Sequence, residues 1–234
     1  MRSNKKHTLL CALTFVTLSA FYAPRAEAQS EDEFQLWSAL LSSGAFQPET
    51  PRVGFWFDLH ARRGDAGTVV IVRPGVGLEV NDWLSLWVGY AWVPVFTDGA
   101  DSRSEHRLWQ QAILKHSTSN WTLQARTRFE QRFSEGGDDV GFRFRQFVRA
   151  NWQPSQSSPV GLAVWDELFV GFNDTDWGAA AGFDQNRLFL GPFLKMAPWA
   201  RLEVGYLFAY LRREPVNRVA HTLAINLFIS LRPQ

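Results

Sequence analysis

Two neighbouring segments of the chain place arginine at alternate positions, with apolar or aromatic residues between. These arginines are Arg126, Arg128 and Arg132 in the first segment and Arg143, Arg145 and Arg149 in the second. Because side chains two residues apart share one face of a β-strand, the pattern predicts neighbouring strands with one charged and one apolar face. Similar alternation runs from Val53 almost to the C-terminus, in segments of about ten to fourteen residues that suit tilted membrane strands.

The first 28 residues have the organisation of a secretory signal peptide. A basic start precedes an apolar run over 9–23, and Ala26-Glu27-Ala28 matches an A-x-A cleavage site. A retained anchor is the alternative, but an apolar run of about 15 residues is short for a membrane span. We therefore predict export through the periplasm, a cleaved signal over 1–28, an N-terminal segment over 29–51 that could form a first strand, and a barrel over 52–234.

Composition excludes several classes of function. The chain without its signal carries a net charge of about −2, which does not favour binding to nucleic acid. Cys11, the only cysteine, lies in the signal, so the exported protein has no disulfide, thiol nucleophile or thiolate metal site. We expect no cofactor and no metal. Since no exported segment approaches the roughly 18 apolar residues of a membrane helix, a β-barrel or a soluble domain remains.

The strand pattern favours an all-β fold, a closed antiparallel transmembrane β-barrel of 10 to 12 strands, with lipid outside and an arginine-rich lumen. Compact turns alternate with longer loops, including the predicted loop over 62–67, and tryptophans flank the turns. From Arg52 onward we count ten strands, and Phe34–Leu41 would make eleven. Bacterial barrels of this type are even-numbered, so we expect that segment not to span or a twelfth strand to exist. A soluble lipocalin-like barrel with its arginines outside is the alternative.

Several motifs occur together in a specific order along nearly the whole exported chain. They are Glu105-His106-Arg107-Leu108-Trp109-Gln110, Arg126-x-Arg128-x-Glu130-x-Arg132, Arg143-x-Arg145, Asp166-Glu167-Leu168-Phe169, Phe183-Asp184-Gln185-Asn186-Arg187, Gly205-Tyr206 and a late His221. This set resembles the domain of unknown function 2490 family. The resemblance implies a bacterial outer-membrane β-barrel and supplies no reaction.

The polar face of each predicted strand defines a network of charged residues that we expect to line the lumen. Its members are Asp58, Arg73, Glu79, Glu105, Arg107, Arg126, Arg128, Glu130, Arg132, Arg143, Arg145, Arg149, Glu167, Arg187, Arg201 and Glu203. One interpretation is a structural network that fills a narrow barrel of unassigned role. The other is a narrow anion-selective channel for small acidic solutes, because the arginines outnumber the acids.

Catalysis and metal binding have weaker support, and we expect no enzyme. An outer-membrane lipid hydrolase would need a serine and a histidine on the outer wall, and Ser104 and His106 are the candidates. The acids at Asp138, Asp139, Asp174 and Asp176 lack a calcium-hand pattern and suit solvated turns. Asp166 is predicted to face lipid, which requires a bulge, a register change or a polar neighbour.

The expected partners follow from the predicted location. We expect a monomer that contacts outer-membrane lipid and lipopolysaccharide and is inserted by the barrel-assembly machinery. The C-terminus departs from the terminal aromatic residue common in such proteins, because the chain ends with 229–234 and Phe228 lies on the opposite face from Leu227 and Ile229.

Overall fold

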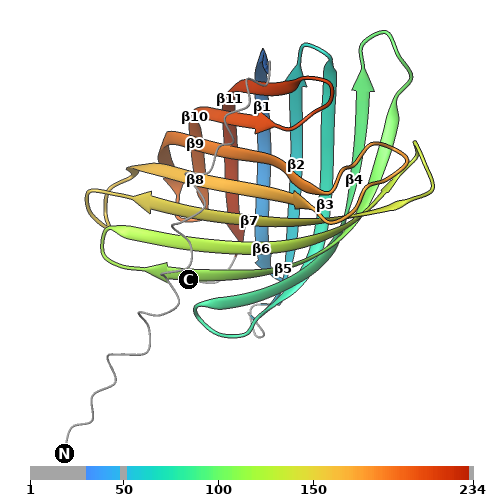
Figure 1. Cartoon of the computed structure of the whole chain (residues 1–234). Helices are drawn as coiled ribbons and strands as arrows, with labels where there is room; N and C mark the ends of the chain where they lie inside the picture. The colour runs from blue at the N-terminus through green and yellow to red at the C-terminus, as the bar shows by residue number, and fades with distance from the viewer. Residues whose placement is uncertain (1–29, 48–51, 232–234) are drawn as a thin grey trace, which may run out of the picture.

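A computed structural model describes residues 30–47 and 52–231, which form eleven strands closed into a barrel (Figure 1). The strands are β1 (Ser30–Ala45), β2 (Val53–Gly64), β3 (Gly67–Glu79), β4 (Leu84–Thr97), β5 (Arg103–Ser117), β6 (Trp121–Ser134), β7 (Val140–Trp152), β8 (Val160–Gly171), β9 (Gly182–Ala197), β10 (Ala200–Leu211) and β11 (Asn217–Leu231). No helix of the described residues is long and apolar enough to cross a membrane. The predicted signal peptide lies outside the described residues.

The barrel closes through a parallel pair of strands, β1 and β11, which lie side by side in Figure 1. Their register runs from Ser30 opposite Asn217 to Gly44 opposite Leu231. All other neighbouring pairs of the described strands are antiparallel. We call the β1–β11 pair the seam.

The expectation of an even strand number is wrong, since the described residues form eleven strands. Successive strands reverse direction, so an odd number leaves the first and last strands running the same way, and closure requires a parallel pair. β1 therefore begins at the end of the barrel that carries the connections 65–66, 98–102, 135–139, 172–181 and 212–216, which we call the loop rim. β11 ends at the opposite end, the turn rim.

The outer wall is apolar along the strands. Large side chains that point outward remain exposed, as in Val76 at 51%, Leu190 at 52% and Leu223 at 51%. Trp83, Trp121, Trp152 and Trp199 lie at the turn rim and are also exposed. An apolar band bounded by aromatic residues is typical of barrels that span a membrane.

The lumen is filled by aromatic as well as charged side chains. Trp109 is fully buried and packs against β3 and β4 at Gly75 and Gly89. A Cβ atom at Gly75 would lie 2.5 Å from Cη2 of Trp109, so a larger residue there would displace the indole. A second apolar cluster, with Phe189 and Leu207 at its centre, lies on the wall formed by β8 to β11.

Candidate functional site

The lumen holds the charged residues that the alternation singled out. Eleven are buried, namely Asp58, Arg73, Arg126, Arg128, Glu130, Arg143, Arg145, Arg149, Glu167, Arg187 and Glu203. The other five, Glu79, Glu105, Arg107, Arg132 and Arg201, are half-buried. Because successive strands keep their registers, the alternate positions of each strand point to one interior.

Two glutamates and three arginines form the centre of this network. Glu130 on β6 accepts hydrogen bonds from Arg143 at 2.6 Å and from Arg145 at 2.6 Å. Arg145 also donates to Glu167 on β8 at 2.7 Å, and Arg126 reaches the same carboxylate at 2.7 Å. Each carboxylate is therefore shared by at least two guanidinium groups, an arrangement that their planar forks allow.

Further charged clusters lie on either side of this centre. Toward the loop rim, Glu105 accepts hydrogen bonds from Arg107 at 2.7 Å and Arg132 at 2.5 Å. Toward the turn rim, Glu203 forms ion pairs with Arg149 and, at 3.1 Å, with Arg201. Charged groups thus extend through the height of the lumen.

The opposite wall of the lumen carries a smaller charged cluster. Arg73 donates to Asp58 at 2.8 Å, and the ring of His60 lies 3.8 Å from the same carboxylate. The wall formed by β2 and β3 therefore supplies a cation of its own to the lumen.

Aromatic rings cover the guanidinium faces that the carboxylates leave open. Phe169 lies under Arg145 and Arg187, each with its guanidinium carbon 4.5 Å from the ring centroid. Arg128 lies 4.7 Å from the ring of Trp109. Phe228, whose opposite parity was noted in the sequence, is in contact with Arg201 at 4.6 Å, so it faces the lumen. Such contacts favour arginine over lysine.

Two cavities lie on either side of the filled centre. The loop-side cavity, of about 360 Å³, lies between the network and the loop rim. The turn-side cavity, of about 460 Å³, lies between the network and the turn rim. Five residues line both cavities, namely Trp37, Arg62, Arg73, Arg145 and Arg187. Side chains alone therefore separate the two cavities.

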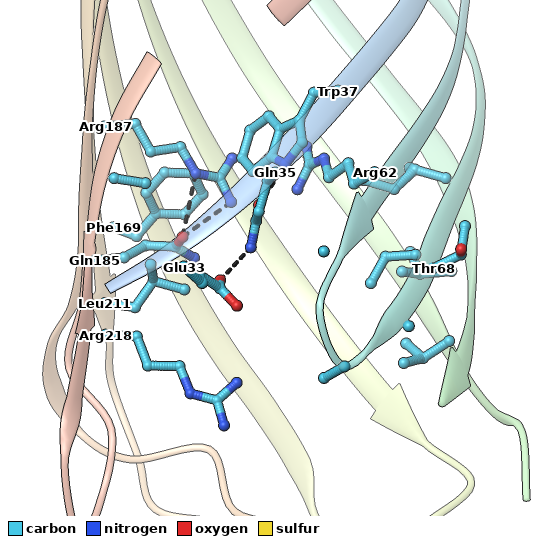
Figure 2. Close-up of a pocket in the computed structure, with 18 of the residues that line it drawn as sticks. Glu33, Gln35, Trp37, Arg62, Thr68, Phe169, Gln185, Arg187, Leu211 and Arg218 are labelled. Atoms are coloured by element: carbon cyan, nitrogen blue, oxygen red, sulfur yellow. Dashed lines mark hydrogen bonds between the residues drawn. The ribbon is translucent and has the colours of Figure 1, made fainter. Parts of the chain in front are cut away.

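Sequence reasoning missed part of this lining. Arg62 belongs to β2 and faces the lumen, so the predicted loop over 62–67 begins too early. The alternation Asp58-x-His60-x-Arg62 is the signal that could have identified it. Figure 2 shows the inward residues of β1, Glu33, Gln35 and Trp37, at the loop-side cavity.

The outer wall accommodates Asp166 through a neighbour. The side-chain amide of Asn186 on β9 donates to both carboxylate oxygens of Asp166, at 3.0 Å each. A register shift follows at Phe169 and Val170 of β8. Asn186 thus supplies the hydrogen bonds that the Asp166 carboxylate could not obtain from lipid hydrocarbon.

The two candidate hydrolase residues share the outer wall but have separate partners. Ser104 Oγ accepts a hydrogen bond from the indole of Trp92 at 3.3 Å. His106 Nδ1 is hydrogen-bonded to the hydroxyl of Tyr90 instead. In the described part of the chain, none of their hydrogen bonds joins the serine to the histidine.

The loop acids bind backbone amides. Asp176 accepts from the amides of Asp138 at 2.8 Å and Asp139 at 3.2 Å, and it thereby joins the loops 135–139 and 172–181. The hydrogen bond from the Asp138 amide holds the pKa of the Asp176 carboxyl below its ordinary value. Within 30–47 and 52–231, no group of three histidine, cysteine or acidic side chains is arranged to hold a metal.

The chain is similar to a known protein family and to one curated protein. Residues 34–220 match the family described as "Protein of unknown function (DUF2490)". An uncharacterized protein of Methylorubrum extorquens is 36% identical over 232 residues, which cover 96% of this chain and 98% of that protein.

Two solved structures are similar to the barrel. The KdgM porin has a TM-score of 0.45 at 10% identity, covering 72% of this chain and 81% of that chain. A loop-deletion mutant of OmpT, an outer membrane protein of Vibrio cholerae, has a TM-score of 0.41 at 15% identity, covering 72% and 60%.

Proposed function

The chain belongs to the DUF2490 family of proteins of unknown function, and starting from this membership we propose that it is an outer-membrane barrel whose lumen binds and passes small anions. The proposal assigns no catalytic role. The protein acts as a monomer in contact with outer-membrane lipid and lipopolysaccharide, after insertion by the barrel-assembly machinery.

The outer wall supports the membrane location. Exposed leucine and valine side chains cover the strands, which would be costly in water and suits the hydrocarbon of a bilayer. The exposed tryptophans of the turn rim have the position of an interfacial girdle. A soluble barrel would bury this face, and here the buried face is the charged one.

The observation that carries the anion proposal is the charge of the loop-side cavity. Glu33 is the only acid among its lining residues. Its cations are Arg62, Arg73, Arg107, Arg132, Arg143, Arg145, Arg187, Arg213 and Arg218. Seven of these arginines also form ion pairs with carboxylates, and Arg62 and Arg218 form none among the described residues, so an excess of positive charge remains at the cavity. Such an excess concentrates anions and repels cations.

The centre of the lumen determines how an anion would pass. Arg128, Glu130 and Glu167 are at most 4% exposed, so there is little free space there. Passage therefore requires rearrangement of the side chains that separate the two cavities. A structural network without conduction is the competing function, and the same buried groups support it.

Single-channel recording in a planar bilayer under a salt gradient tests the proposal. We expect discrete current steps with a reversal potential that indicates anion selectivity. The double variant R107Q/R218Q removes two cavity charges and should shift the reversal potential toward zero.

R63Q is the matched control for this measurement. Arg63 follows Arg62 in sequence but pairs with Asp98 in an exposed position, at 2.5 Å, so its replacement should leave selectivity unchanged. A correctly folded barrel that carries no current would contradict the channel proposal and favour the structural network.

A further inference from the structure

The boundary between the two cavities contains an arginine with no carboxylate partner in the described residues. No ion pair of Arg62 is formed there, and its Nε atom is buried without a hydrogen-bond partner. Two further cations, Arg187 and Arg73, line both cavities together with Arg62. A half-buried cation whose Nε lacks a partner, and which lies among other cations, is a reason to look for an anionic ligand.

Trp37 holds this arginine in place. The guanidinium carbon of Arg62 lies 4.2 Å from the centroid of the indole ring, and that of Arg187 lies 4.9 Å from the same ring. Figure 2 shows Arg62 and Arg187 converging on Trp37 from β2 and β9. The aromatic ring positions both cations without neutralising either one.

The indole is itself fixed by the seam strand. Trp37 donates through Nε1 to the side-chain oxygen of Gln35 at 2.5 Å, and the amide nitrogen of Gln35 donates to Glu33. These three residues alternate along β1 and face the lumen (Figure 2). The site is therefore assembled when β1 joins the barrel.

Arg187 has other contacts that leave it available for a ligand. Two of its nitrogens donate to Gln185, at 2.9 and 3.1 Å, and its closest carboxylate is Glu167 at 3.9 Å. The neutral amide of Gln185 accepts hydrogen bonds from Arg187 but does not neutralise the charge of its guanidinium group. Arg62, which has no ion pair among the described residues, and Arg187, whose nearest carboxylate oxygen is 3.9 Å away, thus lie together where the cavities meet.

We propose that Arg62 and Arg187, both held against Trp37, form a binding site for a small oxyanion, a phosphate or carboxylate group. Such groups match the planar donors of arginine in two-point contact. The site rests on the proposed function, because it gives the anion pathway a defined binding position between its two cavities.

Isothermal titration calorimetry of the detergent-solubilised full chain tests the site at constant ionic strength. The probes are inorganic phosphate and succinate in separate titrations, which distinguish the phosphate from the carboxylate. We expect saturable heat for at least one probe. R62Q and R187Q should each weaken that binding by roughly tenfold or more, since each removes charged hydrogen bonds. R62K should retain part of it, because the charge remains and the fork is lost.

Two control variants distinguish binding at a specific site from the general attraction of anions by the positive charge of the lumen. R218Q removes a charge from the same cavity away from Trp37, and R63Q removes the adjacent, paired arginine of the rim. R218Q should weaken binding by clearly less than R62Q does, and R63Q should bind nearly as the parent does, with folding verified by gel mobility before and after heating. Absence of saturable heat with both probes, or an effect of R62Q no larger than that of R218Q, would overturn the site.

Failure of the site and failure of the pathway have different signatures. Saturable binding that depends on Arg62 in a barrel without current supports the site and rejects the pathway. Anion-selective current together with no saturable binding supports the pathway and rejects the site.

Discussion

At the residue scale, the lumen depends on the chemistry of arginine. Arg145 illustrates this, because its nitrogens reach Glu130 and Glu167 while its flat face lies on Phe169. Lysine could supply one such contact but not the fork and the face together. The buried pairs are costly to desolvate, so their presence alone does not imply added stability.

Replacing one arginine of this network should therefore lower the free energy of unfolding by more than the intact ion pairs add to it. We expect R145Q to lower the free energy of unfolding by roughly 3–5 kcal/mol, because Glu130 and Glu167 each lose a buried partner. Equilibrium unfolding in urea, followed by tryptophan fluorescence in detergent, measures the change.

The triple variant R145Q/E130Q/E167Q is the matched comparison for R145Q. It also removes the carboxylates with which Arg126 and Arg143 pair, so it should be less stable than R145Q. If R145Q unfolded at the same urea concentration as the parent, the network would not be coupled as its geometry implies.

Much of this residue-scale arrangement could be predicted from the sequence. The two-residue period assigns Arg126, Glu130 and Arg145 to one face without knowledge of the fold. Which arginine meets which acid could not be predicted, because pairing depends on strand register and on the inward curvature of the whole wall. The place of Arg62 in the lumen was not predicted, because the end of a strand next to a turn has the composition of a loop.

At the element scale, the seam departs most from expectation. A strand over part of 29–51 could be expected from Phe34 onward, but its parallel pairing with β11 follows only from the total strand count. That count cannot be read from local alternation, since a single uncertain segment changes it from even to odd.

Cysteine cross-linking tests the seam directly. Ser38 and Ile225 are aligned across it, so S38C/I225C should form a disulfide upon mild oxidation. In S38C/I229C the second position is four residues farther, roughly 13 Å along the strand, and should not cross-link. Gel mobility with and without reductant reports the bond. Cross-linking of the second pair in place of the first would contradict the register.

At the whole-molecule scale, the two rims differ in their connections. The loop 172–181 is joined to 135–139 through Asp176, and the turn rim carries the exposed tryptophans. Longer connections face the outside in outer-membrane barrels, so the loop-side cavity should open to the medium.

Thiol labelling in intact cells tests this orientation. The only cysteine lies in the predicted signal peptide, so introduced cysteines should report without background. S102C in the loop 98–102 should react with a membrane-impermeant maleimide on intact cells. S157C in the turn 153–159 should react only after the outer membrane is permeabilised. The reverse pattern would mean that the barrel is inserted the other way.

The seam also sets the order in which the barrel can be completed. Ser30 pairs with Asn217, so the edge of the first strand is covered only when the last strand joins the barrel. Until then β1 is hydrogen-bonded to β2 alone, and its exposed edge can pair with a strand of another chain. Truncation near Asn217 would therefore leave a species that assembles with other unclosed chains, which makes closure of the seam a requirement of biogenesis.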